Sequence, residues 1–242
     1  MRLLDHFERI YILNLAERAD RRRQMDAELA GFGLRADGRR IRYFRAVRPA
    51  DAGEFPSLGA RGCFMSHLAI VGEALADGLS SVLVLEDDLG FSPLLCEVPP
   101  AMVDRLRAGR WDFAYLGHVA TSSESARPAW QETALPLATT HFYALNGPVI
   151  GRVHEHLQAC LRRPPGHPLG SPMHVDGAYS VFRMHHPEVV TLIATPSLGG
   201  QRSSRSDIHP NRWYDRLPLS RQLVGLAREL TNRSCWSQTA PR

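Results

Sequence analysis

A run of apolar residues that ends in three adjacent acids is the feature of the sequence best suited to chemistry. Residues 81–85 are serine, valine and leucine, and Glu86, Asp87 and Asp88 follow directly. An aliphatic run without polar alternation is typical of a strand buried on both faces of a parallel sheet. Ligands bind outside the carboxyl ends of such strands. Because three neighbouring carboxylates repel one another, a hard divalent cation that also holds phosphate oxygens would stabilise them.

The alternation of side chains along an extended chain divides these three acids. Glu86 and Asp88 point to one side and Asp87 points to the other. Two carboxylates can therefore share a metal ion while the third orients a neighbouring group. The alternative interpretation is a solvated acidic loop after a strand, which requires no ligand.

The first part of the chain predicts a second group of polar residues at a strand end. Residues 10–15 are rich in β-branched and aromatic side chains and predict a strand that passes through Asn14. A helix that reaches about residue 29 follows, with Arg18 and Arg21 near its start. The free N–H groups of a helix start, together with guanidinium groups, suit a pyrophosphate. The alternative is a solvent-facing helix with charge pairs spaced by four residues.

Two further segments lead into the strand that carries the acids. Residues 42–47 predict a second strand, and apolar residues at helical spacing predict a helix over 63–76. That helix carries Ser66 and His67. The order β-α-β-α-β predicts an α/β fold with a mostly parallel central sheet.

The rest of the chain predicts further elements around these. They are strands over 111–117, 139–145 and 189–194, helices over 100–109, 151–161 and 220–230, and loops over 121–132, 164–172 and 196–206. The proline-rich loop at 164–172 cannot lie inside regular structure, and a loop directly before His174 and Asp176 can line a substrate cleft. We expect one domain over 1–210 and a C-terminal helix and tail over 211–242.

Composition limits the class of protein. The 242 residues are 44% hydrophobic and 22% charged, as in soluble globular proteins. All 29 basic residues are arginine, and they are spread along the chain. This pattern argues against a nucleic-acid partner, which requires a concentrated basic face. The four cysteines form no CxxC pair, so they indicate neither a zinc site nor a disulfide framework, and they favour a reducing compartment.

The sequence also bears on location. The N-terminal residues do not have the apolar core of a signal peptide, and no apolar run is long enough to span a bilayer. We expect a cytoplasmic protein. Arginines near the C-terminus offer the alternative of peripheral contact with the inner face of the membrane, whereas an ordinary packed helix requires no such contact. The oligomeric state is not indicated.

Taken together and in order, several segments resemble glycosyltransferase family 25, the family of lipooligosaccharide and collagen galactosyltransferases. The resemblance extends from Ile10 to about Ile208. Its motifs are INL…R…RR at 12–22, FRAV at 44–47, GCxxSH at 62–67, LEDD at 85–88, THxY at 140–143, a proline-to-aspartate stretch at 172–176 and Q…SDI at 201–208. Three positions differ from the family pattern: Arg48-Pro49 replaces an acid and a glycine, and Thr139 replaces the glycine before THxY.

The resemblance implies a GT-A-type, Rossmann-like domain, a UDP-galactose or UDP-glucose donor, and transfer with inversion. It implies bacterial lipopolysaccharide biosynthesis as the setting and manganese as the metal. The acceptor would be a hydroxyl of a lipid-linked oligosaccharide, another glycan, a hydroxylated peptide side chain or a small molecule.

Glycosyl transfer requires a stabilised diphosphate leaving group, a deprotonated acceptor hydroxyl and exclusion of water. We assign Glu86 and Asp88 to an Mn²⁺ or Mg²⁺ ion that bridges the diphosphate oxygens. Asp87 is assigned to the donor ribose or sugar. The nucleotide is assigned to the end of the first strand, with contacts from Asn14, Arg18 and Arg21.

Asp176 is the candidate catalytic base for inversion by direct displacement, and the alternative is a helix N-cap. His174 and His141 are candidates for a third metal ligand or for a phosphate contact, although a lone histidine is more often structural. Ser66 and His67 either contact the donor or pack against the acidic strand. A lid that closes on the donor is assigned to the late polar residues, namely Gln201, Arg202, Ser206 and Asp207.

Three functions compete at this level. The first is a metal-dependent glycosyltransferase. The second is a phosphohydrolase or nucleotidyltransferase that uses the same acids on a phosphoryl group, for which the sequence offers no obvious nucleophile. The third is a glycan-binding domain without catalysis.

Overall fold

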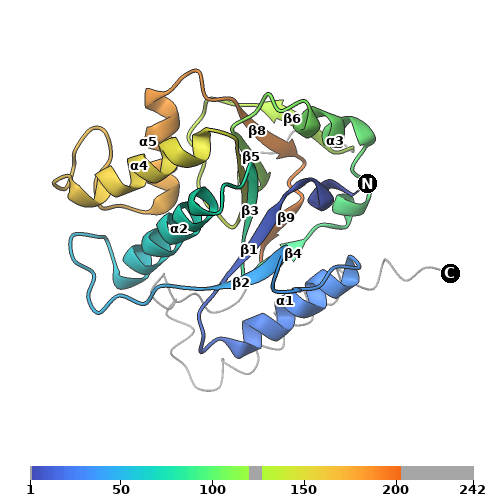
Figure 1. Cartoon of the computed structure of the whole chain (residues 1–242), viewed down its shortest axis with the longest axis horizontal. Helices are drawn as coiled ribbons and strands as arrows, with labels where there is room; N and C mark the ends of the chain where they lie inside the picture. Colours follow the sequence, from blue (N-terminus) through green and yellow to red (C-terminus); the bar gives the residue numbers. More distant parts are fainter. Residues whose placement is uncertain (1, 120–126, 203–242) are drawn as a thin grey trace.

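The computed structural model describes residues 2–119 and 127–202, and these form one seven-stranded sheet with helices on both faces (Figure 1). The sheet order is β2-β1-β3-β7-β5-β8-β6. Strands β7 and β6 run antiparallel to their neighbours, and the other five run in one direction. The expected α/β fold with a mostly parallel sheet is therefore confirmed.

The strands are β1 (Arg9–Asn14), β2 (Ile41–Arg45), β3 (Ser81–Glu86), β4 (Leu89–Phe91), β5 (Phe113–Gly117), β6 (Ala129–Glu132), β7 (Phe142–Asn146), β8 (Thr191–Thr195) and β9 (Gly199–Gln201). The α-helices are α1 (Ala19–Gly31), α2 (Leu58–Ala76), α3 (Pro100–Arg107), α4 (Val149–Arg162) and α5 (Val175–His185), and two short 3-10 helices are η1 (Leu3–His6) and η2 (Pro93–Cys96). None of these helices is long and apolar enough to cross a membrane.

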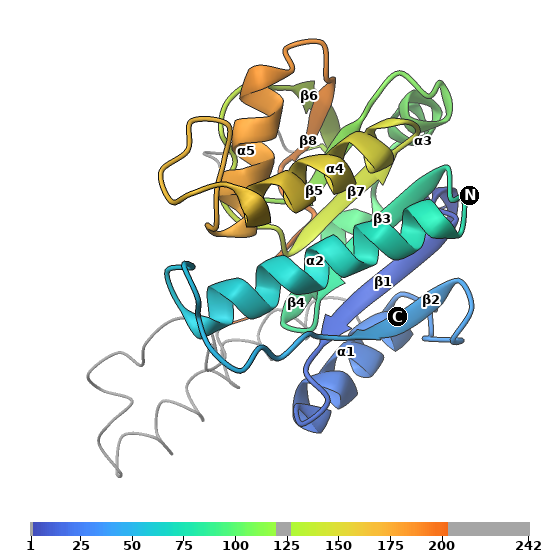
Figure 2. The same cartoon turned by 60° about the vertical axis from the view of Figure 1, so that its left-hand side comes forward.

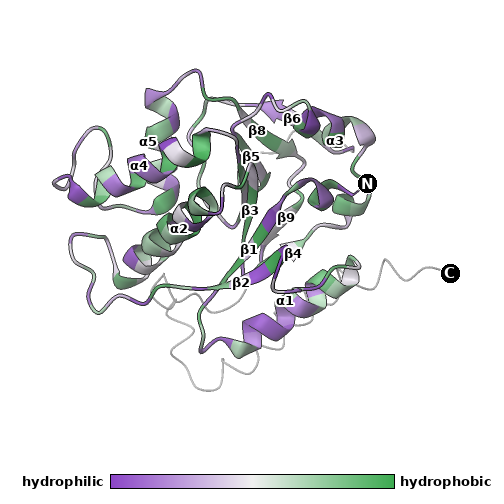
Figure 3. Ribbon diagram, in the orientation of Figure 1, coloured by the Kyte–Doolittle hydropathy of each residue, from purple (hydrophilic) through white to green (hydrophobic). Residues whose placement is uncertain are grey.

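Alternate residues of the central strands belong to two separate cores, one on each face of the sheet. Tyr11 and Val84 face the core formed with α2, α4 and α5. Ile12 and Leu83 face the core formed with α1, α3 and η1. Figure 2 shows α2 and α4 side by side over the sheet with α1 on the far side, and Figure 3 shows that the residues of α1 are mostly hydrophilic. Because both faces are covered, the inner strands have the continuous apolar sequence seen at 81–85.

The strand order reverses at β1. The chain passes from β1 to β2 on one side of it and then crosses to β3 on the other side. The carboxyl ends of β1 and β3 therefore border a crevice, which is the usual ligand position in open α/β sheets. Asn14 is the last residue of β1 and Glu86 is the last residue of β3.

A small second sheet joins the acids to the end of the described chain. Strand β4 follows Asp88 and pairs antiparallel with β9. The sequence predicted a loop over 196–206, and that prediction was wrong for the residues of β9. A side chain on Gly199 would lie 2.9 Å from Leu89 Cδ1, so the glycines that suggested a loop instead permit the close approach of two strands.

Other boundaries also differ from the sequence-based expectations. Strand β6 lies in the segment expected to be a loop at 121–132, and helix α5 begins where the sequence offered a helix start only as the alternative interpretation of Asp176. Helix α2 begins at Leu58, ahead of the expected start, and Ser57 Oγ caps it by accepting a bond from Ala60 N. The expected C-terminal helix and the domain boundary near 210 lie outside the described residues.

Gly117, the last residue of β5, lies between β7 and β9. An added Cβ would lie 2.6 Å from His141 Nε2 and 2.8 Å from the Gly199 carbonyl oxygen. We expect Gly117→Ala to lower the free energy of unfolding by about 1–3 kcal/mol because of overpacking. Chemical denaturation of both proteins measures this difference. Gly200→Ala is the control, since nothing lies within 4 Å of its added Cβ, and equal effects of the two substitutions would contradict the prediction.

Candidate active site

A cleft of about 380 Å³ opens at the carboxyl ends of β1 and β3. Polar residues from five segments line it: Glu17, Arg18, Arg21, Arg48, Ser66, Glu86, Asp87, Asp88, Gln201 and Arg202. A smaller pocket of about 100 Å³ lies beside it and is lined in part by Thr139, His174 and Asp176. Cys63, Glu86 and Gln201 line both pockets, so Glu86 stands at their junction.

Asp87 connects three elements at the base of the cleft. It is 5% exposed. Its Oδ1 accepts a 2.9 Å bond from Arg21 Nη1, and its Oδ2 accepts a 2.7 Å bond from Asn14 Nδ2. Burial raises the pKa of Asp87, and the Arg21 charge opposes that shift. Both oxygens accept bonds from protein groups, so Asp87 holds Arg21 and Asn14 in position. Asp87 also lines the cleft, and its contact with the donor stays a prediction.

Asp88 begins the turn into β4 and is the less satisfied of the two aspartates. Its Oδ2 lies 3.4 Å from Arg21 Nη1, while its Oδ1 is buried without a hydrogen-bond partner among the described residues. Burial raises the pKa of Asp88, opposed by the charges of Arg21 and Arg202. A buried carboxylate oxygen without a partner is a group that a cation would satisfy.

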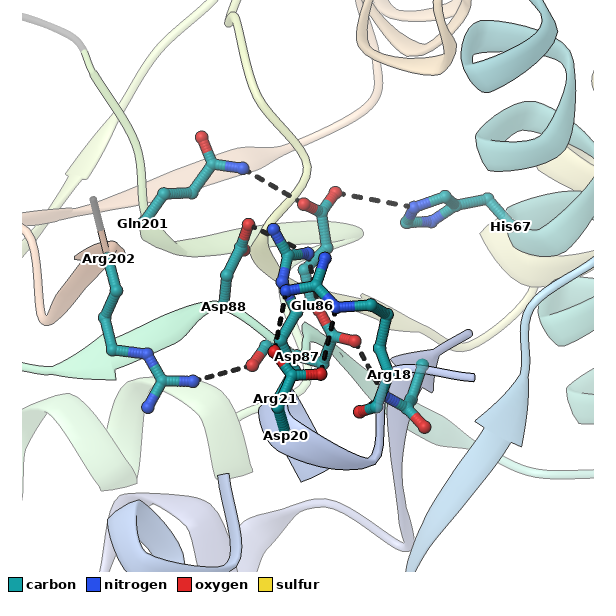
Figure 4. A network of polar contacts seen from close by, with 10 residues as sticks. Arg18, Asp20, Arg21, His67, Glu86, Asp87, Asp88, Gln201 and Arg202 are labelled. Carbon is teal, nitrogen blue, oxygen red and sulfur yellow. Dashed lines mark hydrogen bonds and ion pairs between the residues drawn. The ribbon is translucent and has the colours of Figure 1, made fainter. Parts of the chain in front are cut away.

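Arg202 holds the acidic turn from the opposite side. Its Nη2 donates a 2.7 Å bond to the Asp87 carbonyl oxygen, and its backbone N donates a 2.6 Å bond to the Asp88 carbonyl oxygen. Its Nη1 lies 3.5 Å from Glu28 Oε1 in α1. Arg202 thus fixes the backbone of two of the acids (Figure 4).

Glu86 receives groups from two sides (Figure 4). Gln201 Nε2 donates a 3.1 Å bond to its Oε2, and its Oε1 lies 3.9 Å from His67 Nε2. Its side chain is 15% exposed. Burial, together with the neighbouring Asp88 charge, raises the pKa of Glu86 to about 8, although the Gln201 bond acts in the other direction.

His67 and Ser66 lie on α2 beside the cleft and are both fully buried. His67 Nδ1 lies 2.9 Å from Tyr143 Oη, and burial lowers the pKa of His67 to about 4, so the ring is neutral at pH 7. Ser66 Oγ donates to the Gly62 carbonyl oxygen at 2.6 Å and accepts from Val47 N at 2.8 Å. Ser66 therefore ties the segment after β2 to α2.

Asp176 lies in the first turn of α5, where the helix dipole stabilises its negative charge. It is not the N-cap residue, which is His174. Its Oδ2 accepts a 3.0 Å bond from Thr139 N. Asp176 and the exposed His174 share the smaller pocket with Glu86, so the structure brings together the two acids that the sequence places 90 residues apart.

Thr139 adopts φ 74°, a conformation that β-branched residues rarely take. This is the position where the family resemblance places a glycine, which adopts such a conformation without steric cost. The strained turn points the Thr139 amide at Asp176, and local strain of this kind is concentrated at functional sites.

Not every expected site residue lies at the cleft. His141 is buried behind β9, its Nε2 lies 3.5 Å from the Gly199 carbonyl oxygen, and it borders neither pocket. Burial lowers the pKa of His141 to about 4, so it has the surroundings of a structural residue. Ser206 and Asp207 lie outside the described residues. Two residues that the sequence analysis did not select, Cys63 and Thr140, lie close to Glu86.

Comparison with known proteins identifies a family that matches the first part of the chain. Residues 7–120, which include β1, α1, α2 and all three acids, match the family model of glycosyltransferase family 25 (LPS biosynthesis protein). This segment belongs to glycosyltransferase family 25. A glycosyltransferase 25 family member of Drosophila melanogaster is 28% identical over 206 residues, covering 78% of this chain and 33% of the relative.

Further family 25 relatives match shorter stretches. One from Aedes aegypti is 32% identical over 125 residues, covering 45% of this chain and 21% of the relative. An inactive glycosyltransferase 25 family member 3 of Homo sapiens is 29% identical over 136 residues, covering 49% of this chain and 23% of the relative. The chain thus spans a third or less of these relatives. The solved structure of a glycosyltransferase involved in the glycosylation of the major capsid of PBCV-1 aligns over 82% of this chain and 94% of that chain. The two are 12% identical with a TM-score of 0.47, a similarity too low to support an argument about the fold.

The raised pKa of Glu86 makes stability depend on pH. Between its ordinary pKa of 4.5 and about 8, the folded state binds more protons than the unfolded state, so stability falls as pH rises through this window. We expect Glu86→Gln to remove this loss. In chelator-treated protein, the melting temperature of the variant should exceed that of the wild type by more at about pH 8 than at about pH 5.

Glu155→Gln is the matched control, because Glu155 lies exposed on α4. The difference in melting temperature between Glu155→Gln and the wild type should be the same at both pH values. A Glu86→Gln variant that behaves like this control would contradict the assigned pKa.

Proposed function

We propose that this chain is a metal-dependent, inverting glycosyltransferase that moves a hexose, galactose or glucose, from a UDP-sugar to an acceptor hydroxyl. The observation that carries the proposal is the position of Glu86. This acid ends β3 at the junction of a cleft lined by arginines and a smaller pocket that contains Asp176. Such an arrangement supplies one space for a charged donor and a second space for an acceptor beside it.

Glu86 and Asp88 are the proposed ligands of an Mn²⁺ or Mg²⁺ ion. Both are oxygen donors, as hard cations prefer, and the unpartnered Asp88 Oδ1 supports this fit. When bound, the ion would neutralise charge on the leaving diphosphate. Gln201 donates to Glu86 Oε2 and thereby holds the orientation of that carboxylate.

The proposed donor site is the larger cleft. Arg18 and Arg21 lie at the start of α1 and line this cleft. Helix starts and guanidinium groups both favour phosphate oxygens. Arg21 is oriented by its bond to Asp87, so it is preorganised for a diphosphate. Preorganised charge is usually the largest source of transition-state stabilisation.

Asp176 is the proposed general base. It lies in the smaller pocket on the other side of Glu86, where Thr139 N fixes its carboxylate. From there it would take the proton of the acceptor hydroxyl as that oxygen attacks the anomeric carbon from the face opposite the diphosphate. His174, exposed at the rim of this pocket, would contact the acceptor. The acceptor class is a part of this proposal that rests on the family resemblance, whereas the cytoplasmic location and the membrane contact are parts that rest on the sequence alone.

A binding domain without catalysis is the second candidate, since the human relative is named inactive. The two candidates differ in what Asp88 does. We expect a UDP-hexose to raise the melting temperature of the full chain only when Mn²⁺ or Mg²⁺ is present, because the ion would neutralise the diphosphate charge beside the acids. Asp88→Asn should abolish this metal-dependent shift.

Glu97→Gln, a change at the end of η2, is the control and should keep the shift. A shift of equal size without metal, or one retained in Asp88→Asn, would contradict metal-dependent donor binding. Indifference to every UDP-sugar would contradict the proposed donor class.

Replacing the proposed base separates catalysis from donor binding. We expect Asp176→Asn to lower kcat for sugar transfer by about 10²–10⁴-fold, the usual contribution of a general base, with the KM for the donor little changed. Product formation measured by mass spectrometry gives both constants. Asp112→Asn would also remove a carboxylate that accepts a backbone bond, but away from the cleft, and should leave kcat within a few-fold. A kcat in Asp176→Asn equal to that of this control would remove Asp176 from the mechanism.

A further inference from the structure

Three side chains at the junction of the two pockets form a group with a different chemistry from the oxygen pair Glu86 and Asp88. One potential ligand atom from each of Cys63, His67 and Glu86 lies within 4.8 Å of the other two, and His67 Nε2 lies 3.9 Å from Glu86 Oε1. Within residues 2–119 and 127–202, this is the group of three potential ligands that meets that spacing, and Asp88 is not part of it.

The His67 ring supplies the strongest observation. Its Nε2 is buried and has no hydrogen-bond partner among the described residues, although it faces Glu86 Oε1 at 3.9 Å (Figure 4). Leaving a buried polar atom without a partner costs free energy, so this nitrogen is suited to a group that the protein itself does not supply.

The other ring nitrogen is already held as metal-bound histidines hold it. Nδ1 lies 2.9 Å from Tyr143 Oη, and Tyr143 Oη lies 2.8 Å from Tyr179 Oη. With the proton on Nδ1 donated to Tyr143, the lone pair of Nε2 points at Glu86. A ligand histidine almost always donates its second N–H in this way, which fixes both the tautomer and the ring orientation.

The spacing and the donor types select the class of cation. Sulfur, imidazole nitrogen and carboxylate oxygen together are typical zinc ligands, whereas Mg²⁺ and Mn²⁺ prefer oxygen alone. Ligand atoms of a tetrahedral zinc ion lie about 3.3–3.8 Å apart. Small side-chain movements would therefore bring these three ligand atoms to the spacing that zinc requires. Burial and the charges of nearby acids raise the pKa of Cys63, and a bound cation reverses that effect because it deprotonates a coordinating thiol.

We propose that Cys63, His67 and Glu86 form a binding site for a borderline or soft divalent cation, with Zn²⁺ as the best fit. Cys63 and Glu86 both line the pockets, so the fourth coordination position faces the cleft. Three protein ligands and one open position are the arrangement of accessible zinc sites, as opposed to closed structural ones.

One consequence rests on the proposed function. Glu86 cannot serve the soft site and the hard oxygen site fully at the same time, so Zn²⁺ would inhibit a transferase that runs on Mn²⁺. The binding itself does not depend on that function and is tested without any sugar.

Co²⁺ is the probe, because it replaces zinc and reports its ligands spectroscopically. Titration of the reduced, metal-free full chain with Co²⁺ should give a near-ultraviolet thiolate-to-cobalt charge-transfer band and the strong visible bands of four-coordinate cobalt. One equivalent of Zn²⁺ should displace it. Cys63→Ser should lose the charge-transfer band, and Tyr143→Phe should weaken the affinity about 10–100-fold because it removes the acceptor for His67 Nδ1.

Two controls separate this site from its alternatives. Cys96→Ser removes an exposed free cysteine and should leave the spectrum unchanged. Asp88→Asn removes a proposed ligand of the hard site and should also keep the charge-transfer band. A wild-type chain without that band, or a band that survives in Cys63→Ser, would overturn the soft-metal site. Retention of the band in a chain that binds no UDP-sugar would leave this site standing while the proposed function fails.

Discussion

The burial of acidic side chains at the end of β3 is the constraint on which the rest of the site depends. Charges in a protein interior are costly unless close opposite charges and hydrogen bonds compensate them. Here the compensation comes from distant parts of the chain: Asn14 and Arg21 bond to Asp87, and Arg202 bonds to the backbone of the turn. The first strand, the first helix and the last described strand are therefore all held by one acidic turn. That compensation is incomplete, because the pKa values of all three acids are raised and Asp88 Oδ1 has no hydrogen-bond partner among the described residues. Incomplete compensation leaves a site receptive to a cation.

Helix α2 lines the cleft and joins the segment after β2 to the acidic strand end. A side chain on Gly62 would lie 2.9 Å from the Val47 carbonyl oxygen, so only glycine permits the approach of the β2 exit segment. Ser66 then bonds both Gly62 and Val47. Four residues apart on the same helical face, Cys63 and His67 are directed at Glu86. The GCxxSH motif thus has two physical roles. Gly62 and Ser66 hold the segment after β2 against α2, and Cys63 and His67 direct sulfur and nitrogen toward Glu86.

Glu86 lines both pockets and therefore couples them. Any ligand that changes its protonation or its orientation in the larger cleft also changes the smaller pocket, where Asp176 lies. Thr139 adds to this coupling because its unfavourable backbone conformation is maintained by the bond from its amide to Asp176. A glycine would adopt that conformation more easily, but it would also hold the amide less rigidly.

The amino-acid sequence by itself determined the strands and the chemistry at their ends. Residues 81–85 predict a buried parallel strand because both of its faces need apolar side chains, and the acids, Asn14 and Arg21 follow at strand and helix ends where backbone geometry places them at one edge. Tertiary structure alone decided the rest, since it depends on contacts between residues far apart in the chain. It turned the glycines near 199 into a strand paired with β4, placed His141 behind that strand, gave Asp87 an internal role and brought Asp176 to Glu86. Side-chain periodicity reports which face of an element is buried, but it does not report which partner covers that face.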